Sequence, residues 1–154
     1  MKRSRIFALV LAACILQVSV VNYFKVFGIK PDLILISVVL AGLFCDLKFA
    51  LAFSIFAGAF KDIYGLGGFG INTILLPLWS ILAAYSARRI SIDINLTRAL
   101  LVFVAASLNA IIMTVFLWYT GEPVSFGIFM RIIFLDSLYT ALVSLVAFKA
   151  LKIK

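Results

Sequence analysis

The segment Ala99–Tyr119 contains no charged side chain from end to end. A helix of that length reaches about 30 Å, the thickness of the hydrocarbon core of a bilayer. Because lipid offers no hydrogen bonds to the backbone, a helix is the structure that such a segment forms. The rest of the chain is similar, since 66% of the 154 residues are hydrophobic and 13% are charged. The sequence therefore predicts an all-α integral membrane protein without a folded aqueous domain.

Charged and polar residues divide the chain into six apolar segments. The second and third are short, and they reach spanning length only with flanking residues and with Lys30 and Lys61 extended toward the interface. We interpret them as two short helices rather than as one interfacial hairpin. The prediction is a single domain of six transmembrane helices, at residues 6–24, 29–46, 47–64, 71–87, 99–119 and 126–148.

The basic residues are unequally divided between the two ends of these segments. Six spans place on one side Lys2, Arg3, Arg5, Lys48, Arg88, Arg89, Arg98, Lys149, Lys152 and Lys154, and on the other Lys25, Lys30, Lys61 and Arg131. By the positive-inside rule, both termini are expected in the cytoplasm. The basic residues lie at the ends of the apolar segments and form no continuous stripe. The net charge of +8 is therefore typical of the residues that flank transmembrane helices, and it does not predict a nucleic-acid partner.

The first segment contains Leu11-Ala12-Ala13-Cys14, which matches the cleavage box of a bacterial lipoprotein. The apolar sequence continues beyond Cys14, where a lipoprotein has a polar tether. We therefore expect an uncleaved helix in which Cys14 is a packing residue.

No group of residues predicts catalysis or a cofactor. The chain has no His, and its six acidic residues are scattered over different segments. The stretch "GLGGFG" approaches a dinucleotide-binding fingerprint, but it lacks a strand-helix-strand context. We expect a protein that is not an enzyme and binds no metal or cofactor. The glycines are expected to form a turn between the third and fourth segments, and they are Gly65, Gly67, Gly68 and Gly70.

Small residues recur every four positions along the third segment. Ala50, Ser54 and Gly58 share one helix face, which ends in Asp62. Such a face lets another helix approach closely, either within the chain or from a partner protein. A carboxylate near hydrocarbon is costly unless it is paired or hydrated. We expect Asp62 to accept hydrogen bonds from amides of the glycine turn or of the next helix start.

The sixth segment carries a second polar face. Asp136, Thr140 and Ser144 follow one another at helical spacing, and this face should point into the bundle. Asn109 in the fifth segment and Gln17 in the first are candidate hydrogen-bond partners for Asp136.

The order of these features resembles the MreD family of rod shape-determining membrane proteins. The resemblance is carried by "KPDLILISVVL" at 30–40, by "AGAFKDIYGLGGFGINTILLPL" at 57–78, and by a span that ends in "ARR". The residues that match the family's pattern are Pro31, Asp32, Gly58, Asp62, Gly65 and Gly70.

The resemblance implies a scaffold in the bacterial cytoplasmic membrane. It implies binding to the transmembrane helix of MreC, and an indirect link between the MreB cytoskeleton and the peptidoglycan synthases of wall elongation. It also implies a fold similar to the substrate-binding subunits of energy-coupling-factor vitamin transporters. A transporter subunit of that kind is the alternative function, but the short outer loops and the lack of convergent polar groups favour the scaffold.

Overall fold

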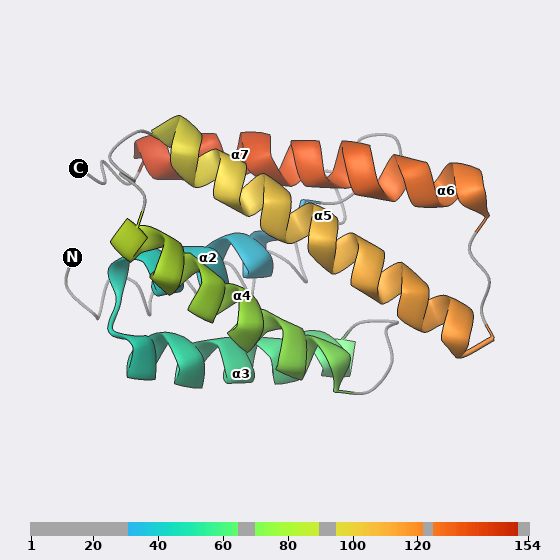
Figure 1. Ribbon diagram of the computed structural model, residues 1–154, viewed down its shortest axis with the longest axis horizontal. Coiled ribbons are helices and arrows are strands. Elements are labelled where there is room, and N and C mark those ends of the chain that lie inside the picture. Colours follow the sequence, from blue (N-terminus) through green and yellow to red (C-terminus); the bar gives the residue numbers. More distant parts are fainter. Residues whose placement is uncertain (1–30, 65–69, 90–94, 122–124, 151–154) are drawn as a thin grey trace. The chain divides into compact units, whose positions relative to one another are not determined.

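The structure is a computed structural model that describes residues 31–64, 70–89, 95–121 and 125–150 (Figure 1). These residues form helices and turns, with no strand among them. The helices are α2 (Leu33–Phe44), α3 (Leu47–Tyr64), α4 (Ile71–Arg89), α5 (Asn95–Tyr119), α6 (Phe126–Arg131), the π-helical turn η1 (Ile132–Asp136) and α7 (Ser137–Ala150). The fold is therefore all-α, as the composition predicts.

Contacts divide the chain into two compact units, each of which is described by itself. Unit 1 contains α2, α3 and α4, whereas unit 2 contains Asp32 together with α5, α6, η1 and α7.

Unit 1 is built around the antiparallel pair α3 and α4, and α2 packs against both of them (Figure 1). The helix α2 begins directly after Pro31-Asp32, where aspartate is a preferred residue for a helix N-terminus. Nine of its twelve residues are buried. A helix that is apolar on all sides belongs in an interior, so α2 forms much of the core of this unit.

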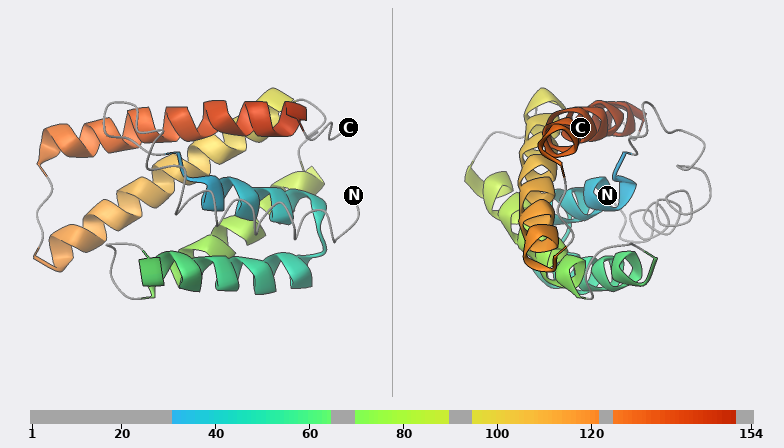
Figure 2. Two further views of the ribbon diagram at one scale, coloured as in Figure 1. Left: turned by 180° about the vertical axis from the view of Figure 1, so that it is seen from behind. Right: turned by 90° about the vertical axis from the view of Figure 1, so that its right-hand side faces the viewer.

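Unit 2 is a helical hairpin of α5 against the continuous helix α6–η1–α7. The two arms lie side by side where α5 begins and α7 ends, and they diverge toward α6 (Figures 1 and 2). Near the divergent end, the rings of Trp118 and Phe129 are in contact, with centroids 5.8 Å apart. Small residues on both helices are buried, among them Ala106, Ala110 and Ala141. Small side chains allow this close approach.

Among the described residues, two helical stretches are long and apolar enough to cross a membrane, and both belong to unit 2. They are Leu96–Tyr119 and Phe126–Lys149. The helix α3 has 18 residues but carries Lys48, Lys61 and Asp62, and α2 has only 12 residues. At about 1.5 Å per residue, α2 is shorter than the hydrocarbon core. The crossing of all six segments remains a prediction, as does their assembly into a single domain.

The helix ends differ from the expected segments in several places. The helix α3 occupies residues 47–64, as expected, and α4 begins at Ile71 but continues to Arg89. The helix α5 begins at Asn95, four residues before the expected Ala99. The π-helical turn within the sixth segment was not predicted. The segment 6–24 and residues 29 and 30 lie outside the described residues.

Candidate helix-packing site

The carboxylate of Asp62 joins the end of α3 to the start of α4. Its Oδ1 accepts hydrogen bonds from the backbone N–H of Asn72 at 3.1 Å and from Nδ2 of Asn72 at 2.8 Å. Its Oδ2 accepts from the backbone N–H of Thr73 at 2.9 Å and from the Thr73 hydroxyl at 2.7 Å. We call this set of three residues the α3–α4 clasp. The sequence predicted that Asp62 accepts from amides either of the glycine turn or of the next helix start. The structure shows the second of these, because both backbone donors lie in the first turn of α4.

Two features of the α4 N-terminus make a carboxylate favourable there. The first amides of a helix have no acceptor within the helix, and Asn72 and Thr73 lie in the first turn of α4. The helix dipole also places partial positive charge at this end. Asp62 is 7% exposed, and its four donors match an ionised carboxylate, which has only acceptors. All four hydrogen bonds of this carboxylate therefore hold α3 against α4 within unit 1.

Gly58 lies one turn before Asp62 and touches the backbone of α4. A Cβ atom at this position would lie 2.6 Å from the carbonyl oxygen of Asn72 and 2.6 Å from the Cα of Thr73. No side chain fits there without moving one of the helices. The absence of a side chain at Gly58 thus lets α3 come close enough for Asp62 to reach the α4 amides.

The rest of the predicted small-residue face is also buried. Ala50 and Ser54 are fully buried on α3, and the Ser54 hydroxyl donates to the carbonyl of Leu51 at 2.9 Å. A hydroxyl that bonds back to its own helix can lie in an apolar interface. All four residues of this face, Ala50, Ser54, Gly58 and Asp62, are therefore buried. The face packs within the chain, which is the first of the two alternatives given for it.

A second close approach, which the sequence analysis did not identify, joins α2 to α4. A Cβ atom at Gly42 would lie 2.5 Å from the carbonyl oxygen of Ser80 and 2.9 Å from the Cβ of Ala83. The helix α4 thus meets a glycine of α3 near its start and a glycine of α2 further along. At both glycines the backbone of α4 lies in direct contact with the backbone of the neighbouring helix.

Of the predicted glycine turn, only Gly70 lies among the described residues. It has a φ of 89°, in the left-handed region that glycine adopts at little cost, and it directly precedes α4. Gly65, Gly67 and Gly68 lie outside the described residues.

The predicted polar face of the sixth segment lies in unit 2. Thr140 and Ser144 are fully buried in α7, and Asp136, the last residue of η1, is half-buried. The Thr140 hydroxyl accepts a hydrogen bond from the backbone N–H of Asp32 at 3.2 Å, and Ser144 donates to the carbonyl of Ala141 at 2.7 Å. Asn109 is buried in α5, which packs against both η1 and α7. Gln17, the other candidate partner for Asp136, lies outside the described residues.

Two further features were missed by sequence reasoning, the pair Asn72 and Thr73 and the burial of Arg98. Asn72 and Thr73 form a polar pair in the first turn of an otherwise apolar helix, and that position is a signal that could have identified them. Arg98 was interpreted as a charge at the end of a span, but its side chain is only 2% exposed. Ser137, which lies beside the predicted polar face of the sixth segment, is buried, and its hydroxyl has no hydrogen-bond partner among the described residues.

The described residues contain no group of three His, Cys, Asp or Glu side chains that could hold a metal ion. Comparison with protein families, with curated proteins and with solved structures finds no match to this chain.

Proposed function

We propose that this chain is a non-enzymatic scaffold of the bacterial cytoplasmic membrane, similar to MreD. In this proposal it crosses the membrane six times, with both termini in the cytoplasm and a fold similar to the substrate-binding subunits of energy-coupling-factor transporters. It binds a single-span, MreC-like protein. Through that partner it couples the MreB cytoskeleton to peptidoglycan synthesis, and so regulates cell shape.

The observation that supports this proposal most strongly is the α3–α4 clasp. Gly58, Asp62 and Gly70 belong to the motif that resembles the family, and each has a structural role in unit 1. Gly58 admits the backbone of α4, Asp62 accepts its first amides, and Gly70 turns the chain into it. A motif whose polar group is satisfied in this way suits a rigid framework rather than acid–base chemistry.

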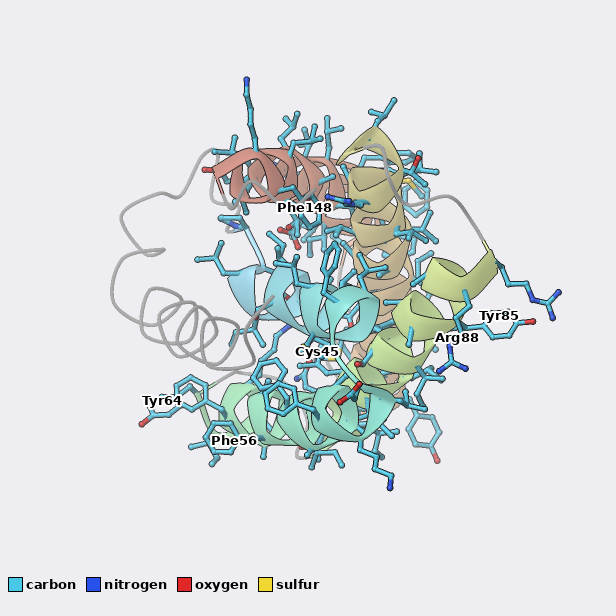
Figure 3. The ribbon with its side chains drawn as sticks, turned by 90° about the vertical axis from the view of Figure 1, so that its left-hand side faces the viewer. Cys45, Phe56, Tyr64, Tyr85, Arg88 and Phe148 are labelled. Carbon is cyan, nitrogen blue, oxygen red and sulfur yellow. The ribbon has the colours of Figure 1, made fainter. Side chains whose placement is uncertain are left out.

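Both units expose many large apolar side chains, which could contact the helix of a partner protein. On α3, Phe56 and Tyr64 are 60% and 66% exposed and point away from the unit (Figure 3). In unit 2 the exposed apolar residues include Leu100, Val104, Leu108, Val115, Leu138, Leu142 and Val146. In lipid, such surfaces contact acyl chains or the packed side chains of a partner helix.

Purification of the tagged chain from its native membrane tests the proposal. Mass spectrometry of the copurified proteins is expected to find an MreC-like protein together with wall synthases. Recovery of ATP-binding cassette subunits in their place would identify a transporter subunit and refute the scaffold.

Paired variants sharpen this experiment. Phe56→Ala and Leu142→Ala each truncate an exposed apolar side chain, one in each unit, so that both should leave the fold intact. The partner helix is expected to be lost from only one of them, which would assign its contact surface to that unit. Equal capture of the partner by the parent and by both variants would show that neither side chain contributes to recognition.

A further inference from the structure

A cavity of about 240 Å³ lies at the end of unit 1 where α2 gives way to α3. The contact of Gly42 with Ser80 holds α2 close to α4, and the cavity opens just beyond it. There α2 ends at Phe44, the chain turns through Cys45 and Asp46, and α4 continues to Arg89. Cys45 and Arg88 mark this end, which faces the viewer in Figure 3.

The lining of this cavity carries opposite charges. Arg88 and Asp46 are both exposed residues, and both line the cavity. The last turns of α2 and α4 add the partial negative charge of helix C-termini, and the first turn of α3, which begins at Leu47, adds the partial positive charge of a helix N-terminus. The cavity thus offers a donor group for an anion and acceptor groups for a cation.

The surrounding residues are typical of a membrane-water interface. The Arg89 guanidinium lies 5.1 Å from the centre of the Tyr85 ring, and Lys48 is exposed at the start of α3. Tyrosine and basic residues concentrate at the headgroup level of membrane proteins. The positive-inside rule assigns this end, with Lys48, Arg88 and Arg89, to the cytoplasmic leaflet.

We propose that this cavity binds a phosphoethanolamine group, with its phosphate on Arg88 and its primary ammonium on Asp46. The source is the headgroup of a phosphatidylethanolamine lipid in the cytoplasmic leaflet. This inference depends on the proposed placement of α2, α3 and α4 in the membrane, and it is independent of the scaffold's protein partners.

The size and polarity of the cavity favour this headgroup over others. At about 240 Å³ the cavity is larger than a single ion needs, and it suits a compact headgroup. Guanidinium pairs strongly with phosphate oxygens, and a primary ammonium has three N–H donors for acceptors such as Asp46. The quaternary ammonium of phosphatidylcholine has no N–H to donate, and phosphatidylglycerol has no cation.

Reconstitution of the full chain in vesicles tests this assignment. The vesicles contain phosphatidylcholine, alone or mixed with phosphatidylethanolamine or phosphatidylglycerol of the same acyl chains. Native mass spectrometry after gentle extraction counts the lipids that stay bound. Phosphatidylethanolamine is expected to be retained over the other two lipids by about tenfold, the scale of one charge-assisted contact. Soluble glycerophosphoethanolamine should compete with it, because the recognised group is the headgroup.

Matched variants separate a built site from surface charge. Arg88→Ala is expected to abolish the preference, whereas Arg89→Ala, which removes the same charge outside the lining, should retain it. Asp46→Asn keeps a residue suited to a helix N-terminus and should also lose the preference.

Three results would overturn the assignment. They are equal retention of the three lipids, a preference for phosphatidylglycerol, or equal effects of Arg88→Ala and Arg89→Ala. Incorporation into vesicles without the expected preference contradicts only the headgroup site. Failure of the parent chain to incorporate contradicts the proposed membrane placement as well.

Discussion

At the scale of single residues, Asp62 accepts on both carboxylate oxygens, and a substitution there acts through the donors that it leaves behind. Asp62→Asn keeps one acceptor, and rotation of the Asn72 amide and the Thr73 hydroxyl can restore most of the network. One backbone N–H then lacks an acceptor, at a cost of about 1–3 kcal/mol. Asp62→Leu removes all four hydrogen bonds and should cost more. Unfolding in detergent is expected to show the highest free energy of unfolding for the parent, a lower one for Asp62→Asn and the lowest for Asp62→Leu.

The same two variants also distinguish the clasp from a direct partner contact. If both fold as stably as the parent yet both lose the copurified partner, Asp62 contacts that partner and the capping account fails. Loss of an ion pair with another protein would make the asparagine variant as harmful as the leucine variant.

Gly58 gives a second prediction at this scale. Gly58→Ala places a Cβ atom 2.6 Å from the Asn72 carbonyl oxygen, and since backbone cannot move aside cheaply, unfolding should become easier by about 1–3 kcal/mol. Gly127→Ala is the control, because Gly127 lies in α6 and a Cβ there meets nothing within 4 Å. That change should be neutral or stabilising, since alanine favours helix. Equal unfolding behaviour of the two variants would contradict the close contact.

The role of Asp62 could be predicted from sequence, whereas its partners could not. An aspartate near hydrocarbon needs donors, and a helix start supplies them, so the type of contact follows from residue chemistry. Which amides it meets depends on how the chain turns between Tyr64 and Ile71. Gly42 was missed for a related reason, since its contact with Ser80 depends on the crossing of two helices and has no local signature.

At the scale of helices, the π-helical turn η1 gives a prediction about register. A π-helical turn inserts one residue into an α-helix, so that the flanking faces keep their directions. Deletion of the exposed Phe134 should convert η1 to regular α-helix and leave the buried stripe of Ser137, Thr140 and Ser144 in place. Deletion of Leu108 from the regular helix α5 should rotate one half of it by about 100° against the other.

The yield of folded, detergent-stable protein measures both deletions. The variant that lacks Phe134 is expected to be recovered, whereas the variant that lacks Leu108 should aggregate or be degraded. Loss of both variants to the same extent would contradict the interpretation of η1 as an inserted residue.

Helix positions followed from composition more readily than helix ends or irregular turns. The polar residues around Asp46 and the charges at Arg88 and Arg89 interrupt the apolar pattern, so most helices could be located. The early start of α5 was missed because Asn95 and Arg98 resemble a loop, although Arg98 is buried. The turn η1 was missed because a shift of one hydrogen bond leaves no pattern in apolar side chains.

At the scale of the whole molecule, the six-span proposal predicts the sidedness of two positions. On a background without Cys14 and Cys45, a cysteine at Glu122 should react with an impermeant maleimide added to intact cells. A cysteine at Lys152 should react only after the membrane is permeabilised, because six crossings and the positive-inside rule place both termini in the cytoplasm.

The pattern of labelling distinguishes six spans from other numbers. Reaction of Lys152→Cys in intact cells, or of Glu122→Cys only after permeabilisation, would contradict the model of six spans. An odd number of crossings would place the two termini on opposite sides, which a cysteine at Ser4 would reveal.

The short sequence separation of the α3–α4 clasp has a consequence for biogenesis. Asp62 reaches residues only ten and eleven positions later, so the clasp closes a small loop at little entropic cost. The contact can form once the first turn of α4 has left the ribosome. If α3 crosses the membrane as proposed, it would then enter the bilayer with the carboxylate of Asp62 already hydrogen-bonded to the amides of α4. Membrane insertion of α3 is therefore expected to depend on the nascent chain beyond Thr73, and a truncation before Asn72 should leave α3 outside the lipid.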